Sequence, residues 1–288
     1  MMVDGLSAAL RALSFVALFQ AAGMTLFLGL FGHHLYQSEK GTRRIATGTA
    51  LVAIALVVAQ YLLEAARMSG DFAGTMDPTS QRLVLHSSTA IALAARVLGL
   101  VLLVTALRSR SVLNAASILA GLALVLASFV FVGHTAMHPQ RWLVGSLLWV
   151  HLLIVAFWFG AMVPLFRASS LERAAAAGAV IEAFSALALW FVPVIFVAGA
   201  CLAIFLVRTF DGLRTTYGEL LLVKVALFAV LLGLGALNKW RLGPRVGRGD
   251  ARALAHFRRT LAVEYLLIAA TLSVTAVLTT FYSPGEDS

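Results

Sequence analysis

Three histidines and a methionine stand close together in a chain that is otherwise strongly apolar. His134, Met137 and His138 fall where one apolar segment ends, and His151 lies about eight residues inside the next one. Imidazole nitrogen and thioether sulfur suit copper, as Cu(I) or Cu(II), and related late transition metals. A histidine inside an apolar span is costly unless it faces a cavity or a partner, so His151 points to function. The pattern predicts a metal-uptake site.

A further histidine, His86, is expected about one helical turn below the end of another apolar segment on the same side. The hypothesis is that His86, His134 and His151 converge in the outer third of a helix bundle, with His138 or Met137 closing the site. Two plainer interpretations stay open. A histidine near a helix end usually contacts water or a lipid headgroup, and a deep histidine can be a packing residue bonded to a neighbouring helix.

The composition places the chain in a membrane. Of its 288 residues 61% are hydrophobic, and its mean hydropathy is +0.93, too apolar for a soluble domain. The single cysteine, Cys201, excludes a disulfide framework and a CxxC metal site. The net charge of +9 does not indicate nucleic acid, because the basic residues fall between apolar spans. No phosphate-binding glycine loop or Ser/His/Asp arrangement is evident, so an enzyme is not expected.

The apolar segments define the elements that would position these side chains. Eight of them are each about long enough to cross a hydrocarbon core of ~30 Å as a helix. We retain the first as a span rather than a cleaved signal peptide, since its basic region is weak and its apolar core is long. The predicted spans are Ala12–Gly32, Ile45–Ala66, Leu83–Leu107, Val112–Gly133, Leu143–Phe166, Phe184–Val207, Glu219–Trp240 and Leu261–Phe281.

The basic residues predict the orientation. Lysines and arginines gather in the first, third, fifth and seventh connections, and the seventh, residues 241–259, is the richest. The positive-inside rule then puts these connections in the cytoplasm and both termini in the periplasm. The expected fold is all-α, one integral membrane domain over residues 1–288. The alanine-rich stretch Ser169–Ala183 is predicted to be a surface helix, and Pro193 to kink span six or free carbonyls.

Three charged side chains inside the spans need partners. Lys224 in span seven could meet Glu64 at a matching depth, and Glu264 in span eight matches Asn238 at the end of span seven. Arg96, near the middle of span three, has no acid at equal depth. It must find backbone carbonyls, water, Gln20 or a bound anion. The plain interpretation of Lys224 and Glu264 is structural, as buried pairs that fix helix register.

Beneath His151 the chain offers softer groups. Trp158, Met162, Met24 and the carbonyls near Pro193 are expected below it in the cytoplasmic half. A site that conducts must bind weakly enough to release, so His151 is predicted to transfer the ion rather than set the affinity. Cu(I) suits this path because it tolerates thioether and few ligands.

Several motifs resemble those of the copper-resistance protein D (CopD) family of bacterial inner-membrane proteins. They keep their order and spacing over residues 133–281, while the first three spans match only in hydropathy and number. The motifs are Gly133-His134-Thr135, H-L-L-x-x-x-x-W-x-G from His151 to Gly160, Ala183-Phe184-Ser185, the run from Tyr217 to Lys224, the run from Asn238 to Pro244, and Arg259 to Glu264.

The resemblance implies copper uptake from the periplasm through the inner membrane, often beside a small periplasmic copper-binding protein of the CopC type. It implies His134 and His151 as copper ligands. It also marks four polar or aromatic positions of the family, namely Trp158, Lys224, Asn238 and Glu264. Met137 and His138 are not part of the pattern, so their role rests on their chemistry alone.

Three functions remain open at this stage. The first is a copper permease. The second is a membrane electron-transfer protein with b-type haem, which needs axial histidines at matching depth on facing spans. Only His151 is deep, so His86 or His134 would have to supply the other ligand. The third is a copper-binding scaffold that transports nothing.

Overall fold

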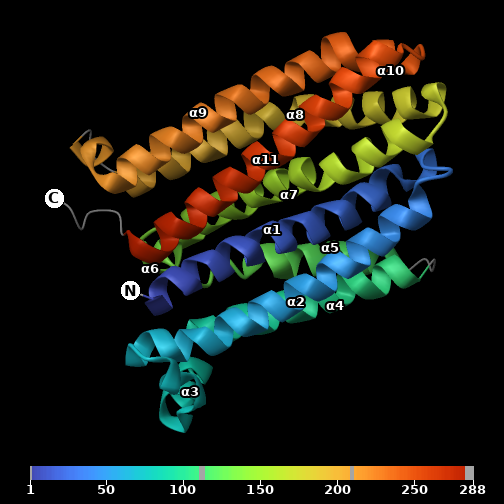
Figure 1. Ribbon diagram of the computed structural model, residues 1–288. Helices are drawn as coiled ribbons and strands as arrows, with labels where there is room; N and C mark the ends of the chain where they lie inside the picture. The colour runs from blue at the N-terminus through green and yellow to red at the C-terminus, as the bar shows by residue number, and fades with distance from the viewer. Residues whose placement is uncertain (1, 110–113, 208–210, 283–288) are drawn as a thin grey trace.

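The computed structural model describes residues 2–109, 114–207 and 211–282 and is helical throughout, with no strand in these ranges (Figure 1). The long helices run along one bundle axis with α5 beside them, and the other short helices join them at the two ends of the bundle. The long helices are α1 (Met2–Phe31), α2 (Glu39–Ser69), α4 (Ser88–Arg108), α7 (Arg141–Leu171), α8 (Ala174–Val207), α9 (Thr216–Leu237) and α11 (Ala251–Phe281). The shorter ones are η1 (Gly32–His34), η2 (Phe72–Met76), α3 (Pro78–Leu85), α5 (Asn114–Ala127), α6 (His134–Met137), η3 (Asp211–Arg214), η4 (Asn238–Leu242) and α10 (Gly243–Gly247).

Helix α1 is the centre of the bundle. It is apolar on nearly every face, and such a helix is stable only when other helices surround it. It packs against α2, α7 and α11. Its most apolar stretch is 72% buried, more than that of any other long helix described here. The first predicted span is therefore the core element on which the other helices assemble.

The α1–α7 crossing depends on two glycines. A Cβ at Gly23 would overlap the backbone of Ala156, and one at Gly160 would overlap the backbone of Gly23. Small residues let membrane helices approach until their backbones touch, and van der Waals packing then replaces the hydrophobic drive that lipid does not supply. This contact fixes the register of α7, which carries His151 and Trp158.

Within the described ranges, seven helices are long and apolar enough to cross a membrane. Helix α5 is also apolar but has 14 described residues, so it is shorter than the others. Both chain ends lie at the same end of the bundle (Figure 1). The predicted all-α membrane class is confirmed, while the count of eight spans and the periplasmic placement of the termini stay predictions.

Two boundary predictions are wrong. Residues Ser169–Ala183 do not form a separate surface helix. Helix α7 continues to Leu171, and α8 starts at Ala174 and runs unbroken past Pro193. The alanine-rich stretch is the first part of a long helix because it packs against α10 and buries Ala177, Val180 and Ile181.

The third predicted span also begins too early. Residues 83–85 belong to α3, and α4 starts afresh at Ser88. The chain breaks there because the Ser87 hydroxyl accepts a hydrogen bond from the Thr89 amide (3.2 Å), which caps a new helix. His86 therefore lies in the turn between two helices and not one turn inside a span.

Candidate functional site

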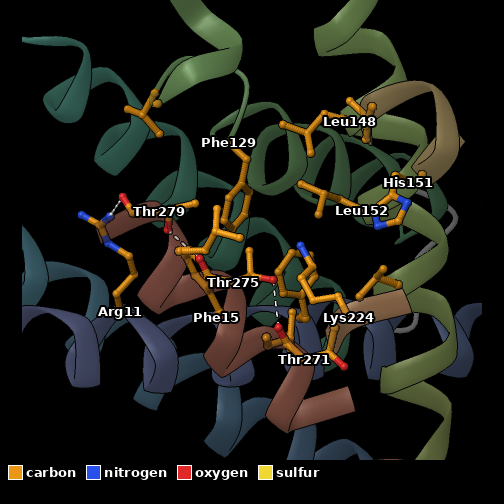
Figure 2. Close-up of a pocket in the computed structure, with 18 of the residues that line it drawn as sticks. Arg11, Phe15, Phe129, Leu148, His151, Leu152, Lys224, Thr271, Thr275 and Thr279 are labelled. Carbon is orange, nitrogen blue, oxygen red and sulfur yellow. Dashed lines mark hydrogen bonds between the residues drawn. The ribbon is translucent and has the colours of Figure 1, made fainter. Parts of the chain in front are cut away.

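A cavity of about 680 Å³ lies inside the half of the bundle that carries the termini (Figure 2). Helices α1, α2, α4, α7, α8, α9 and α11 line it, together with Phe129. Most of its wall is aliphatic or aromatic. The polar lining residues are Arg11, Gln60, Tyr61, Glu64, Arg67, Ser88, Thr89, Arg96, His151, Trp158, Tyr217, Lys224, Thr271, Thr275 and Thr279.

His151 faces this cavity from α7. It lies ten residues after Arg141, which is about 15 Å along the helix. A Cβ at Gly199 of α8 would lie 3.5 Å from Cε1 of the ring, so the imidazole packs directly against the backbone of α8. Its Nδ1 atom is buried and has no hydrogen-bond partner among the described residues. The backbone of Ile195 also faces the ring, but without the geometry of a hydrogen bond to Nδ1. A ring nitrogen is thus free for a ligand.

Lys224 reaches the same cavity from α9 and lies near enough to His151 to interact with it electrostatically. Figure 2 shows these two side chains on one side of the cavity and Arg11 on the other. The predicted partner Glu64 is wrong, because its carboxylate contacts Arg67 (3.3 Å) and Arg11 (4.0 Å) instead. Within the described ranges, no carboxylate lies within 4 Å of the Lys224 ammonium.

Arg96 has partners that the sequence did not reveal. Its Nε donates to the Ser128 hydroxyl (3.0 Å), and its guanidinium lies 4.7 Å from the ring centroid of Phe129. Both residues follow directly after α5, which packs against α4. Gln20 is not the partner, since neither amide atom of its side chain makes a hydrogen bond in the described structure.

A buried polar network lies beneath the cavity. The carboxylate of Glu264 in α11 accepts hydrogen bonds from Trp158 Nε1 in α7 (3.0 Å) and from the Asn238 amide. Thr260 in turn donates to Asn238 Oδ1. Asn238 opens the π-helical turn η4, a widened turn of a kind that often marks functional sites. The match of Glu264 with Asn238 is confirmed.

The bond from Trp158 to Glu264 was not predicted. The feature of the sequence that could have revealed it is the similar depth of an indole N–H and a carboxylate in the membrane, because each of them needs a hydrogen-bond partner in lipid. Because Trp158 also lines the cavity, this network forms part of the cavity floor.

The structure describes the surroundings of three of the four outer residues, His86, Met137 and His138. His86 is exposed, and Met137 is 88% exposed. The Nδ1 atom of His138 accepts a hydrogen bond from the Gln140 amide (3.1 Å), and its ring meets Phe205 edge-on. His134 begins α6, but its side chain lies outside the described part of the structure. Across the described residues no three His, Cys, Asp or Glu side chains gather as a metal site. The convergence of His86, His134 and His151 stays a prediction.

The two methionines of the proposed inner path lie next to the phenylalanine core. Met24 and Met162 belong to one buried cluster with Phe27, Phe31 and Phe157, and neither is among the residues that line the cavity. They pack as apolar side chains in this conformation. A path through them requires helix movement.

Two family models match this chain, one in each half. The family model described as copper resistance protein D matches residues 178–278. The model of the copper resistance protein D-like N-terminal domain matches residues 2–141. The likeness thus extends into the first three spans, where the motifs alone did not reveal it.

Individual relatives are also similar to this chain. Copper resistance protein D of Pseudomonas syringae pv. tomato is 31% identical, over 91% of this chain and 92% of that protein. The copper transport protein CutJ of Bacillus subtilis is 30% identical over 97% of this chain, which spans about half (53%) of that protein. The inner membrane protein YebZ of Escherichia coli is 27% identical over 46% of each chain. No solved structure matches. The chain belongs to the copper resistance protein D family.

Proposed function

We propose that this protein carries copper inward across the bacterial inner membrane and that His151 passes the ion through the outer half of the bundle. The family supports a copper-related membrane function. The observation that carries the proposal is the unpartnered ring nitrogen of His151, buried at the wall of a large cavity. Burying a ring nitrogen there without a hydrogen bond costs free energy unless a ligand binds to it.

The cavity suits transfer better than storage. His151 is the one histidine among the described lining residues, and a single imidazole gives weak binding that allows release. Cu(I) is the proposed cargo, because it accepts few ligands and carries a single charge. The floor at Trp158 and Glu264 would then separate the cavity from the cytoplasmic half.

Capture is proposed to occur at the end of the bundle where α6 lies. His134, Met137 and His138 belong to α6 or follow it, and His86 lies in the turn that precedes α4. With both termini in the periplasm, this end faces outward. The exposed thioether of Met137 would then be accessible to a periplasmic copper-binding partner of the CopC type.

The test is copper uptake into proteoliposomes, with surface binding measured separately on the detergent-solubilised protein. His151→Ala should abolish uptake and leave binding by the outer residues largely intact. His256→Ala is the control, since His256 is exposed near the start of α11, at the far end of the bundle. Equal loss of binding and uptake in His151→Ala would indicate one shared site and no relay. A wild-type protein that binds copper but takes none up would be a scaffold.

One observation favours a second candidate, a b-type haem. The cavity is large, apolar and has a free imidazole nitrogen in its wall. However, no second histidine on a facing helix is among the described lining residues, so a bis-histidine haem is not supported. An absorption spectrum of the purified protein decides, because bound haem gives a Soret band and copper transport needs none.

A further inference from the structure

Two positive charges at the cavity lack an acidic partner. Among the described cavity residues, Arg11 and Arg67 are balanced, because Glu64 contacts both and Asp4 also contacts Arg67 (3.7 Å). Arg96 and Lys224 have no carboxylate within 4 Å in the same part of the structure. Each lies eight residues inside its helix, Arg96 from Ser88 and Lys224 from Thr216, so both are about 12 Å from the same end of the bundle.

Of the two cations, Arg96 has the greater need of hydrogen-bond partners. Arg96 is only 8% exposed, and it lines the cavity. Nε is satisfied by Ser128, but no hydrogen bond to the two terminal guanidinium nitrogens is found within the described ranges. A buried guanidinium needs hydrogen-bonding partners on all its donors, and its paired terminal nitrogens match a carboxylate or phosphate.

The surroundings of these charges are apolar. Phe15, Phe19, Leu93, Phe129, Leu152 and Leu231 are among the other lining residues. A cavity of this size is within the range of about 300–1,000 Å³ that holds small organic ligands. An apolar chamber with two fixed positive charges is complementary to a molecule with an apolar body and an acidic head.

One side of the cavity faces the membrane. Helices α8 and α9 both line it, yet α9 packs against α11 rather than closely along α8. Phe196 of α8 and Val225 of α9 are lining residues that remain 62% and 57% exposed. In a bilayer, lipid tails cover this side of the bundle, so a ligand can enter sideways between α8 and α9.

We propose that the cavity binds a membrane amphiphile with an anionic head, a carboxylate or a phosphate attracted by the positive charges of Arg96 and Lys224 in the cavity wall, with its chain extending toward the α8–α9 side. The head supplies the acceptors that Arg96 lacks and the counter-charge that both cations lack. The site shares its cavity with His151, but binding of the amphiphile does not require copper. Its occupant would also offset the positive charge that a copper cation meets beside His151.

Binding is tested without copper on the delipidated protein in a non-ionic detergent. Native mass spectrometry counts bound molecules after addition of palmitate or phosphatidylglycerol, with hexadecanol and phosphatidylcholine as matched probes that have no net charge. The wild type should bind one anionic probe in preference to its matched probe. Palmitate alone would identify a fatty acid as the source, and phosphatidylglycerol a phospholipid head.

Two substitutions should weaken recognition of the anionic head. Arg96→Gln and Lys224→Gln should each weaken binding roughly 10-fold or more, the loss expected for one charge-assisted contact. Arg96→Lys should restore part of it. Arg82→Gln is the control, because Arg82 is exposed on α3 and is not among the lining residues. If Arg96→Gln does not fold, Lys224→Gln decides alone, since Lys224 has no protein partner to lose within the described part. Equal binding of hexadecanol, or unchanged binding in both glutamine variants, would overturn the proposal.

Discussion

The side chains that matter most in this protein are polar groups held in an apolar bundle. Glu264 shows the principle, because it is 2% exposed and its two oxygens accept from Trp158 and Asn238. The carboxylate has no cationic partner among the residues described, so its stability in the membrane depends on these donors. The three groups join α7, the η4 turn and α11 into one unit.

Replacing Glu264 should therefore destabilise the fold from its centre. Glu264→Ala leaves the Trp158 and Asn238 donors buried without an acceptor, at a cost of about 1–3 kcal/mol each. Thermal unfolding in detergent should show a clear loss of stability. Glu182→Gln is the control, since Glu182 is 69% exposed and lies 4.0 Å from Lys239, and a surface pair of this kind contributes little. A Glu264→Ala protein as stable as the control would show that the network is not structural.

His151 is a second buried polar side chain whose role a single substitution can test. We expect His151→Ala to change uptake and not stability, because Nδ1 makes no hydrogen bond to a described group whose loss would matter. Unfolding midpoints of the wild type and the variant should agree within a few degrees. A large fall would mean that the ring is a packing residue against Gly199, the plainer interpretation of a deep histidine.

At the scale of helices, backbone contact decides the architecture. Gly23 and Gly160 let α1 and α7 touch, and α7 then places His151 at the cavity and Trp158 at its floor. The loop after α1 is fixed differently. Glu172, just beyond α7, accepts hydrogen bonds from the Ser38 hydroxyl (2.7 Å), the Ser38 amide (2.9 Å) and the Gln37 amide (2.9 Å).

A methyl group at the crossing should disrupt it. Gly23→Ala places Cβ into the carbonyl of Ala156, and such overpacking typically costs about 1–3 kcal/mol. The matched control is Gly48→Ala in α2, where a Cβ meets nothing within 4 Å. That change should be neutral or stabilising, because alanine favours a helix over glycine. Unfolding midpoints that fall equally in both variants would count against the crossing as a close contact.

The Glu172 contacts predict a pH dependence. Burial raises the pKa of this carboxyl, but the hydrogen bonds from Ser38 and Gln37 outweigh it and bring the pKa below its usual value of 4.5. A lowered pKa in the folded state means that the ionised form stabilises the fold above pH 4.5, and that this stability is lost as the pH falls through the folded pKa. Glu172→Gln should thus unfold at a lower temperature than the wild type at pH 7.

The same difference should shrink as the pH falls below 4.5, because the protonated wild-type carboxyl loses its advantage over the amide. Unfolding scans of both proteins between pH 7 and pH 3 measure it. A gap that stays constant across this range would exclude the ionised carboxylate as its cause.

For the whole molecule, the two ends of the bundle differ in charge. The termini share one end, while the basic α9–α11 connection, with α10, lies at the other (Figure 1). Arg245 pairs there with Asp250, which caps α11. By the positive-inside rule we expect the α10 end to face the cytoplasm.

The topology can be measured directly. A reporter that is active only in the cytoplasm should stay inactive when fused after Ser288. A protease added to intact spheroplasts should leave residues 241–259 uncut, and the same protease should cut them in inverted vesicles. Activity of the reporter, or cutting in intact spheroplasts, would contradict eight spans with periplasmic termini.

Composition and hydropathy were enough to determine the class and the approximate spans, and the motifs indicated the family. A long apolar run has one stable state in lipid, a helix, so local sequence decides it. Helix rise was enough to match Glu264 with Asn238, while the membrane depths of His151, Lys224 and Glu264 stay predictions. The family motifs likewise depend on order along the chain.

The partners of charged groups were decided by tertiary structure alone. The contacts of Arg96 with Ser128, Glu64 with Arg11, and Trp158 with Glu264 depend on which helix faces which, and hydropathy does not encode rotation about a helix axis. The break at Ser87 was missed because residues on both sides of it are apolar enough to read as one span. The cavity is the clearest case. It exists because helices far apart in the sequence leave a space between them, and its charge is the sum of side chains that no single segment brings together.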